Sequence, residues 1–178
     1  MPARGLTIPM TTPEAKIDRR FSSADAEPTE WSAARDQLRD AMSYQLTTVR
    51  VDGRPHQTTI AGVWVDDVFS FTTSSAEQKA HNIQAGNRNV IVTAGNSGWE
   101  GTDVVLEGEA EEVTDVDRLG RLVDAYRTKY DDWFKFRLID GRFTATGAPG
   151  AVLVYDVRAR KAFGFAKGDT FSQTRWRF

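Results

Sequence analysis

The sequence predicts an α+β fold in which short helices surround an antiparallel β-barrel. Several short segments alternate apolar and polar residues and are rich in β-branched side chains, which is typical of strands. Turn-forming pairs such as Asp52-Gly53 join neighbouring segments closely enough for antiparallel hairpins. Two amphipathic stretches with apolar residues three and four positions apart predict helices. With 178 residues, 40% of them hydrophobic, the chain is long enough to form one core without disulfides.

The chain is expected to divide into a flexible N-terminal arm, residues 1–25, and a single barrel domain, residues 26–178. The arm contains Pro2, Pro9 and Pro13 and shows no sustained periodicity, which favours an irregular segment. A first helix should begin near residue 29, where the apolar residues recur at helical spacing. These residues are Trp31, Ala34, Leu38, Ala41 and Met42.

A three-stranded meander is expected after this helix. Residues 45–51 run into Asp52-Gly53, a dipeptide that suits a tight hairpin, and residues 57–65 return as one strand. Asp66-Asp67 then turns the chain into a third strand, residues 68–73.

A short helix and two further strands follow in the middle of the chain. Ser75 and Gln78 fit a capping box that opens a helix ending near Ile83. The two strands are expected over residues 89–94 and 103–113.

The last third of the chain supplies a longer helix and a closing hairpin. The helix is indicated by apolar residues at spacings of three and four, which are Val116, Leu119, Val123, Tyr126 and Tyr130. An aromatic loop with Trp133, Phe134 and Phe136 comes next. Residues 151–157 and 161–165 are expected to form the last two strands.

Charge is unevenly distributed over the second half of the chain. Residues 100–117 contain eight acids and no base, whereas residues 158–177 contain six bases and one acid. Strand alternation places Glu107, Glu109 and Glu111 on one face, so a solvated face explains them better than a pair of catalytic carboxylates does. The basic end is a candidate for contact with an anion.

Composition argues against several classes of function. The chain has no cysteine, and His56 and His81 are its two histidines, so neither thiol chemistry nor a metal site is expected. A formal net charge of −2 does not favour nucleic-acid binding. Apolar runs fall far short of the ~20 residues that span a bilayer, and the first residues lack an apolar leader. We therefore expect a cytoplasmic protein that does not contact a membrane.

The strongest local signal for binding is Thr72-Thr73-Ser74-Ser75 followed by Lys79. Hydroxyl groups at a strand end, the start of a helix and an ammonium group one turn later all favour a phosphate group. Ordinary helix capping beside a solvated lysine explains the same residues, so both interpretations stay open.

Two stretches, LTTVRVDGRPHQTTIAGVWVDDVFSFTTSSAEQKAHNI and the closing KAFGFAKGDTFSQTRWRF, carry a resemblance to a known family. From Trp31 to Phe178 the order of segments resembles the split β-barrel flavin and deazaflavin oxidoreductases, also called the pyridoxamine 5'-phosphate oxidase-like superfamily. The resemblance implies an antiparallel split β-barrel of the FMN-binding type with short peripheral helices. The closing stretch is similar to that of the members that use coenzyme F420, a deazaflavin.

The resemblance also implies roles for individual residues. The strand that lines the flavin or deazaflavin ring would carry Gln57, Thr58, Thr59 and Ile60. The segment that contacts ribityl and phosphate groups would carry Thr72, Thr73, Ser74 and Lys79. Family members pack as homodimers with each cofactor in the groove between two barrels, so Trp176 and Arg177 would lie near a cofactor, that of the partner included.

The implied function is that of an F420-dependent oxidoreductase, which passes a hydride from the reduced deazaflavin to an unsaturated or electron-poor organic acceptor. Two alternatives stay open: an FMN-dependent oxidoreductase of the same fold, and a carrier that binds a flavin, deazaflavin or haem without turnover. Thr59-Ile60-Ala61 lacks the proline that many relatives place there, and the Arg and His pair of true pyridoxamine phosphate oxidases is not recognisable. We assign no catalytic residue and identify no acceptor.

The ending Arg175-Trp176-Arg177-Phe178 is unusually aromatic and basic for a chain terminus. Termini fray unless packing or pairing holds them. We expect the rings of Trp176 and Phe178 to pack on apolar surface at the dimer groove, with one arginine facing an anion or backbone carbonyl groups. A tail that closes only the core of its own barrel is the alternative.

Overall fold

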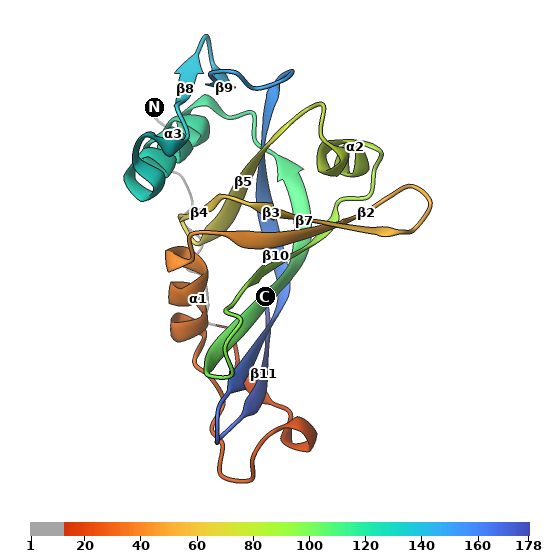
Figure 1. Ribbon diagram of the computed structural model, residues 1–178, viewed down its shortest axis with the longest axis vertical. Helices are drawn as coiled ribbons and strands as arrows, with labels where there is room; N and C mark the ends of the chain where they lie inside the picture. The colour runs from red at the N-terminus through yellow and green to blue at the C-terminus, as the bar shows by residue number, and fades with distance from the viewer. Residues whose placement is uncertain (1–12) are drawn as a thin grey trace, which may run out of the picture.

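The computed structural model describes residues 13–178, and residues 1–12 lie outside the described part. The fold is mixed α+β, with one nine-stranded antiparallel sheet and three α-helices at its flanks (Figure 1). The α+β class and the antiparallel pairing predicted from the sequence are confirmed. Within residues 13–178, no helix is long and apolar enough to cross a membrane.

The elements follow the chain in a simple order. The helices are α1 (Trp31–Asp40), α2 (Gln78–Gln84) and α3 (Val116–Tyr130), with the 3-10 turns η1 (Arg19–Phe21) and η2 (Asp131–Trp133). The strands of the main sheet are β1 (Lys16–Ile17), β2 (Tyr44–Val49), β3 (Pro55–Ile60), β4 (Gly62–Val65), β5 (Val68–Ser74), β6 (Asn89–Ala94), β7 (Gly101–Glu112), β10 (Val152–Lys167) and β11 (Ser172–Arg177). A separate hairpin contains β8 (Phe136–Ile139) and β9 (Arg142–Ala145).

The sheet is built around the long strands β7 and β10. Its order is β1-β11-β10-β7-β6-β2-β3, while β5 pairs with both β10 and β4. Figure 1 shows β2 and β3 crossing the long strands at a steep angle, as strands do in a rolled sheet. In the described residues β3 and β4 follow each other along the chain but do not pair, so hydrogen bonds do not close the sheet into a ring.

The single strand predicted over residues 57–65 is wrong, because the structure divides it at Ala61. β3 pairs with β2, whereas β4 pairs with β5, so the chain changes partners at this corner. Gly62 makes the change possible, since a Cβ there would collide with the ring of Phe69.

The predicted closing hairpin of residues 151–157 and 161–165 is also wrong. Both segments belong to the single strand β10, and a β-bulge between Ala159 and Lys161 separates them without a turn. The true closing hairpin joins β10 to β11 through residues 168–171. The aromatic loop contains the β8–β9 hairpin, whose turn is Asp140-Gly141 with φ of 49° and 72°. This hairpin was not predicted from the sequence, although Asp-Gly is a dipeptide that favours such a turn.

The structure describes only residues 13–25 of the predicted N-terminal arm, since residues 1–12 lie outside the described part. Residues 13–25 are attached to the domain and do not form a free arm. β1 pairs with β11, with Lys16 opposite Arg175, and the hydroxyl of Ser22 accepts a hydrogen bond from the backbone N–H of Gln173 at 3.0 Å. An edge strand offers unpaired backbone groups, and β1 uses those of β11.

The C-terminal tail is held by the protein's own core. Trp176 is completely buried, with its ring centroid 5.4 Å from that of Trp31, and the ring of Phe178 lies 4.8 Å from Trp31. Gly164 leaves room for this packing, because a Cβ there would lie 2.7 Å from the Trp176 ring. The prediction that Trp176 packs at a dimer groove is wrong, because its ring lies in the core of its own chain, whereas Phe178 packs on Trp31 and stays 44% exposed.

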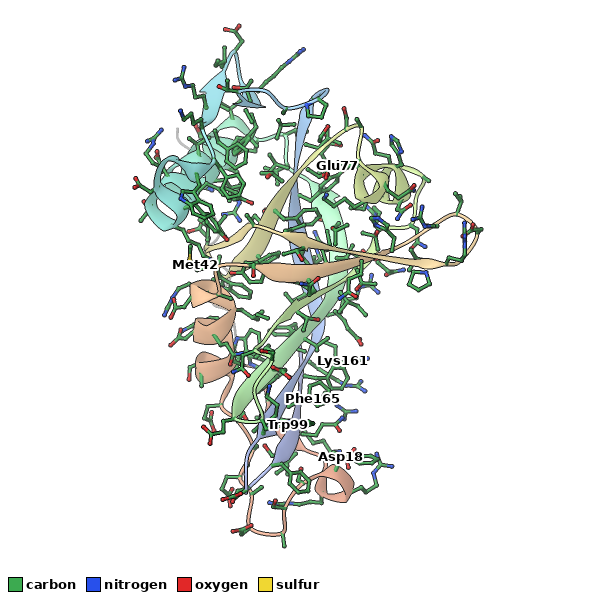
Figure 2. All side chains as sticks on the ribbon, viewed as in Figure 1. Asp18, Met42, Glu77, Trp99, Lys161 and Phe165 are labelled. Carbon is green, nitrogen blue, oxygen red and sulfur yellow. The ribbon has the colours of Figure 1, made fainter. Side chains whose placement is uncertain are left out.

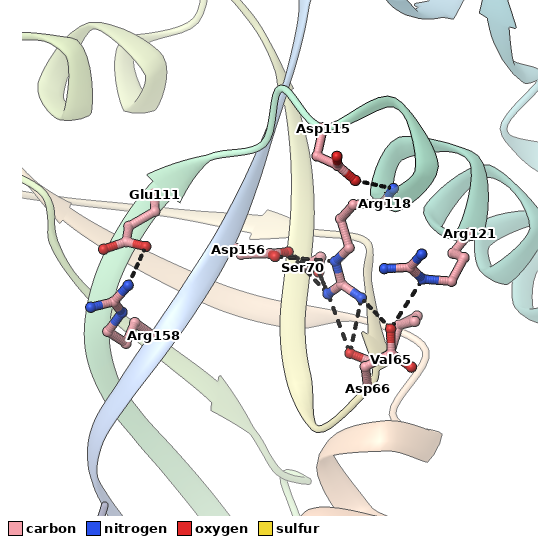
Figure 3. A network of polar contacts seen from close by, with 9 residues as sticks. All are labelled: Val65, Asp66, Ser70, Glu111, Asp115, Arg118, Arg121, Asp156 and Arg158. Carbon is pink, nitrogen blue, oxygen red and sulfur yellow. Dashed lines mark hydrogen bonds and ion pairs between the residues drawn. The ribbon is translucent and has the colours of Figure 1, made fainter. Parts of the chain in front are cut away.

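A buried arginine joins α3 to the sheet (Figure 3). The guanidinium of Arg118 donates to Asp156 on β10 at 3.1 Å and to the hydroxyl of Ser70 on β5 at 3.1 Å. It also donates to the Val65 carbonyl at 3.2 Å and to Asp66 at 3.1 Å. Arg118 is 8% exposed, so these bonds form largely out of water and fix the start of α3 over the β4–β5 turn.

Replacing Arg118 with Ala should lower the free energy of unfolding by about 3 kcal/mol, measured by urea denaturation. This value is at the lower end of the stability losses that follow when a buried ion pair is broken. The loss is small because Asp156 keeps its hydrogen bond from Ser70 and the Asp156 side chain is 26% exposed. Arg121→Ala is the matched control, since Arg121 binds the same Asp66 from an exposed position and should change stability by less than about 0.5 kcal/mol. Equal losses in the two variants would contradict this role.

Candidate functional site

The predicted ring-lining residues lie on β3, at the end of the main sheet. Gln57 and Thr59 point to the exposed face, and the Thr59 hydroxyl receives a hydrogen bond from the side chain of Gln45 at 3.0 Å. Thr58 and Ile60 point to the opposite face, where Ile60 is buried. The hydroxyl oxygen of Thr58 is buried and has no hydrogen-bond partner in the described residues. A buried polar group without a partner is costly, and this hydroxyl faces the interior of the protein, away from the open face of β3.

The predicted phosphate segment contains an internal anion, the carboxylate of Glu77. One of its oxygens receives hydrogen bonds from the Thr73 hydroxyl at 2.7 Å and from the Ser74 backbone N–H at 2.9 Å. The other receives a hydrogen bond from the Lys79 ammonium at 2.5 Å. Figure 2 labels Glu77 at the start of α2. Three of the donors expected to meet a phosphate group therefore already bind a carboxylate.

The predicted capping box at Ser75 and Gln78 is wrong. α2 begins at Gln78 with Glu77 as its N-cap residue, and the Glu77 side chain reaches back to the N–H of Ser74. The Ser75 hydroxyl instead accepts from the N–H of Ala151, while the Ser74 hydroxyl donates to the Pro149 carbonyl. Sequence spacing missed this because the partners around residue 150 are remote in the chain.

Lys79 is a buried lysine, not a solvated one, with 7% of its side chain exposed. Thr73 is buried as well, whereas Thr72 and Ser74 are half-buried at the end of β5. The solvated-lysine interpretation of this motif is therefore wrong. A buried ammonium requires an anion or several acceptors, and Glu77 meets that requirement in this structure.

The two predicted segments lie side by side. The Asn82 amide on α2 donates to the Thr48 hydroxyl on β2 at 2.8 Å, and that hydroxyl lies 3.5 Å from His56 Nδ1 on β3. The pKa of His56 is below its usual value, first because of burial and then because of the positive charges of Arg50 and Lys79. α2 therefore packs against the face of the β2–β3 hairpin that carries Thr48 and His56, opposite the face that carries Gln57 and Thr59.

The C-terminal candidates occupy different environments. Trp176 lies in the core with no exposed surface, so its ring offers no face to a bound molecule in this conformation. Arg177 is exposed and lines a groove of about 590 Å³ together with Lys161, Glu107 and Thr47. This groove lies on the outer face of the sheet, on the side where Figure 2 labels Lys161.

Cross-strand ion pairs neutralise most of the basic end of the chain. Three acids on β7 meet three bases on β10 at N···O distances of 3.0, 2.5 and 2.9 Å. The pairs are Glu107–Lys161, Glu109–Arg160 and Glu111–Arg158. A solvated acidic face was predicted, and the structure shows that this face carries matched charges because β7 and β10 are neighbours.

The register places Arg177 far from the ring-lining residues of the same chain. Paired residues form a row across one face, which runs Gln57, Thr47, Ile91, Glu107, Lys161, Arg177. Five steps between strands of about 4.8 Å each separate its ends by roughly 24 Å. This length is a path along a rolled sheet, and Thr47, next to Gln57 in the row, lines the same groove as Arg177.

Comparison with known sequences identifies a family. Residues 31–160 match the family described as pyridoxamine 5'-phosphate oxidase. No curated protein matches the chain.

Solved structures with the same fold belong to proteins that are described in different ways. A conserved hypothetical protein of Mycobacterium tuberculosis gives a TM-score of 0.61 at 19% identity, covering 82% of this chain and 89% of that one. A protein described as an F420 reductase gives 0.55 at 22% identity, covering 72% and 94%. A heme binding protein of Mycobacterium smegmatis gives 0.61 at 14% identity, covering 83% of this chain and 58% of that one. At these identities the likeness shows the fold alone.

Replacing Glu77 with Gln should make stability less sensitive to acid. Burial raises the pKa of Glu77. Hydrogen bonds from Lys79, Thr73 and the Ser74 N–H together lower this pKa by more than burial raises it, so it lies below the usual 4.5. A depressed pKa contributes stability that is complete above the unfolded-state value and is lost as the pH falls through the folded-state value. In urea unfolding at successive pH values from about 6 to about 3, the stability difference between wild type and Glu77→Gln should shrink. A difference that stays constant would exclude the contribution.

Proposed function

This chain belongs to the pyridoxamine 5'-phosphate oxidase family, and from that premise we propose that it is an oxidoreductase that uses coenzyme F420. The proposed reaction is the reduction of an unsaturated or electron-poor organic acceptor, for which the bound deazaflavin would supply the hydride and solvent the proton. The cofactor-binding residues are Gln57, Thr58, Thr59, Ile60, Thr72, Thr73, Ser74, Lys79 and Arg177. A cytoplasmic location and the absence of nucleic-acid and membrane partners stay predictions from the sequence.

The observation that carries the proposal is the adjacency of β3 and α2. The link from Asn82 through Thr48 to His56 holds α2, with its group of anion donors, against the inner face of the β2–β3 hairpin, whose other face is open. Gln57 and Thr59 on the open face of β3 offer polar groups to a ring edge at this strand. Family members that bind flavins have a ring-lining strand that is followed along the chain by a phosphate-binding segment. In this chain β3 and the segment from Thr72 to Lys79 follow each other in the same order.

A homodimer is part of the proposal, as the family resemblance implies. Arg177 lies roughly 24 Å along the row of paired residues from Gln57. A second copy packed on the same outer face would bring its own Arg177 toward this β3. The half-buried apolar residues Ile91, Val105 and Phe163 share that face and support its burial between protomers.

The protein's own residues bind and orient in this mechanism. The cofactor supplies the hydride chemistry when it is bound, and the protein supplies position and a water-poor surface. Thr73, the Ser74 N–H and Lys79 form an anion-binding set that Glu77 now occupies, so a phosphate group would have to displace this carboxylate. Gln57 and Thr59 present hydrogen-bonding groups on the open face of β3, while Ile60 anchors the strand in the core.

Two alternatives keep the same site. FMN shares the tricyclic ring, ribityl and phosphate groups and differs by lacking the longer anionic tail of F420. The basic residues available for that tail are fewer than the sequence indicated, because Arg158, Arg160 and Lys161 are paired with glutamates. A carrier that binds flavin, deazaflavin or haem without turnover is the other alternative, and one solved structure of this fold is a heme binding protein.

Titration of the purified protein with F420 and with FMN, followed by fluorescence quenching, should give tighter binding of F420. Lys79→Ala should weaken that binding by at most roughly 1.5 to 3 kcal/mol, the range for a charge-assisted hydrogen bond, because the phosphate replaces Glu77 at this ammonium. A clear preference for FMN would overturn the choice of cofactor.

The matched control is Lys167→Ala. Lys167 is also poorly exposed, at 16%, and is paired with Asp103 at 3.0 Å, but it lies at the far end of β10. It should leave cofactor affinity unchanged. Loss of affinity in both variants would indicate a general effect of removing a buried lysine and would leave Lys79 without a specific role.

Turnover separates the reductase from the carrier. With reduced cofactor bound, reoxidation should accelerate when quinones, enones or tetrapyrroles are supplied, because a suitable acceptor opens a path for the hydride. The measurement is the rate of cofactor absorbance change under anaerobic conditions, with and without each acceptor. If no acceptor increases this rate, storage or transport is favoured over catalysis.

A further inference from the structure

The corner between β3 and β4 is the place where the chain leaves the predicted ring-lining strand. In the described residues β3 pairs with β2 alone, so its outer edge has no second strand to hold it. Ala61 and Gly62 form the corner, and glycine lets the backbone approach Phe69 closely. Glycine also leaves the backbone free to adopt other conformations, so the end of β3 needs support from another element.

One face of α3 supplies that support through three side chains. The Tyr126 hydroxyl donates to the Ala61 carbonyl at 3.3 Å. The Tyr130 hydroxyl accepts from the Gly62 N–H at 3.0 Å and donates to the Gly62 carbonyl at 2.9 Å. The Lys129 ammonium donates to the same carbonyl at 3.0 Å. Two consecutive peptide groups are thus bound by a single helix.

Lys129 connects this corner to two further elements. Its ammonium donates to the Tyr44 hydroxyl at 2.6 Å and to the Arg39 carbonyl at 2.8 Å, near the end of α1. Tyr44 stands opposite Ile60 in the β2–β3 register. A helix C-terminus favours a positive charge, so the Arg39 carbonyl is a suitable acceptor.

Lys129 keeps its charge at neutral pH. Burial lowers its pKa to about 8, and the nearby Asp40 acts in the opposite direction. The ammonium has three N–H groups and three oxygen acceptors, one each from α1, β2 and the corner. Its bonding capacity is therefore fully used in holding these elements together.

We propose that Tyr130 and Lys129 are positioning residues that set the end of β3 and, through it, the place of Thr59 and Ile60. The positioning of β3 stands on these contacts alone. Its consequence for ligand binding rests on the proposed function, which assigns Thr59 and Ile60 to the cofactor ring. Neither side chain contacts the cofactor in this proposal.

The competing explanation is that Tyr126 and Tyr130 only contribute to the core beneath α3, where both are buried. Such a role affects the stability of the whole domain. A positioning role affects β3 more than the rest of the sheet. Local hydrogen exchange distinguishes the two, because amides open either locally or with global unfolding.

The test is amide hydrogen exchange of full-length Tyr130→Phe, which removes the hydroxyl and keeps the ring. Amides of residues 56–62 should exchange at least about five-fold faster, because the variant loses both hydrogen bonds of the hydroxyl to Gly62, while those of β6 should not change. An equal increase in β3 and β6, or no increase in β3, would overturn the proposal. Lys129→Met is the second variant, used with the same expected result if Tyr130→Phe does not fold.

Tyr155→Phe is the matched control. The Tyr155 hydroxyl is buried on β10 and has no hydrogen-bond partner in the described part of the chain, so the same chemical change removes no bond. The β3 amides of Tyr155→Phe should exchange hydrogen at the same rate as those of the wild type. An increase at β3 in this control would show that any buried tyrosine has the effect and would overturn the specific role of Tyr130.

Cofactor titration of the same variants keeps this proposal separate from the proposed function. If the wild type binds F420 or FMN, Tyr130→Phe should raise the dissociation constant several-fold with the unfolding midpoint of the apoprotein little changed. Faster exchange at β3 with unchanged affinity would overturn the link to binding. If the wild type binds neither cofactor, the proposed function fails, and the exchange result alone decides whether α3 positions β3.

Discussion

The pairing of β10 with three other strands is the constraint on which the rest of the structure depends. Its sixteen residues pair with β5 at one end, with β7 along most of their length and with β11 at the other end. Backbone groups of a buried strand must find partners, and the bulge at Ala159 lets β10 change direction without losing them. Asp156 then meets Arg118 at one end, and Trp176 covers Gly164 at the other. The position of α3 and the packing of the tail both follow from this strand.

Electrostatic pairing within the chain determines what the candidate site offers a ligand. The acids of β7 face the bases of β10, and Glu77 faces Lys79, so most positive charge near the site is already compensated. Binding an anion at Lys79 exchanges one anion for another. The gain is the difference between two charge-assisted sets of hydrogen bonds, and it is smaller than the gain from filling an empty site. Affinity for a phosphate group then depends on how easily the Glu77 carboxylate moves away from Lys79 into solvent. The Glu77 side chain is already 46% exposed.

The sheet and α3 are linked at the point where the chain changes from one strand partner to another. A strand with a single neighbour is held weakly at its free edge. Tyr126, Lys129 and Tyr130 compensate at the corner by binding the peptide groups of Ala61 and Gly62. Because the same strand carries the predicted ring-lining residues, the helix that completes the fold also sets the geometry of the candidate site.

Local patterns in the sequence determined the elements whose signals lie within a few neighbouring residues. The apolar spacing of α3, the alternation of β6 and the Asp52-Gly53 turn each depend on side chains close along the chain, and the structure has all three. The family resemblance added the predicted ring and phosphate segments, Gln57 to Ile60 and Thr72 to Lys79, by position. Only the tertiary structure decided how those segments are occupied and supported. The carboxylate of Glu77 among the phosphate donors, the burial of Trp176 and the division of residues 57–65 at Ala61 all depend on contacts between remote parts of the chain. The physical reason is that periodicity reports which face of an element is apolar, whereas partner choice among polar groups is settled only when the elements pack and exclude water.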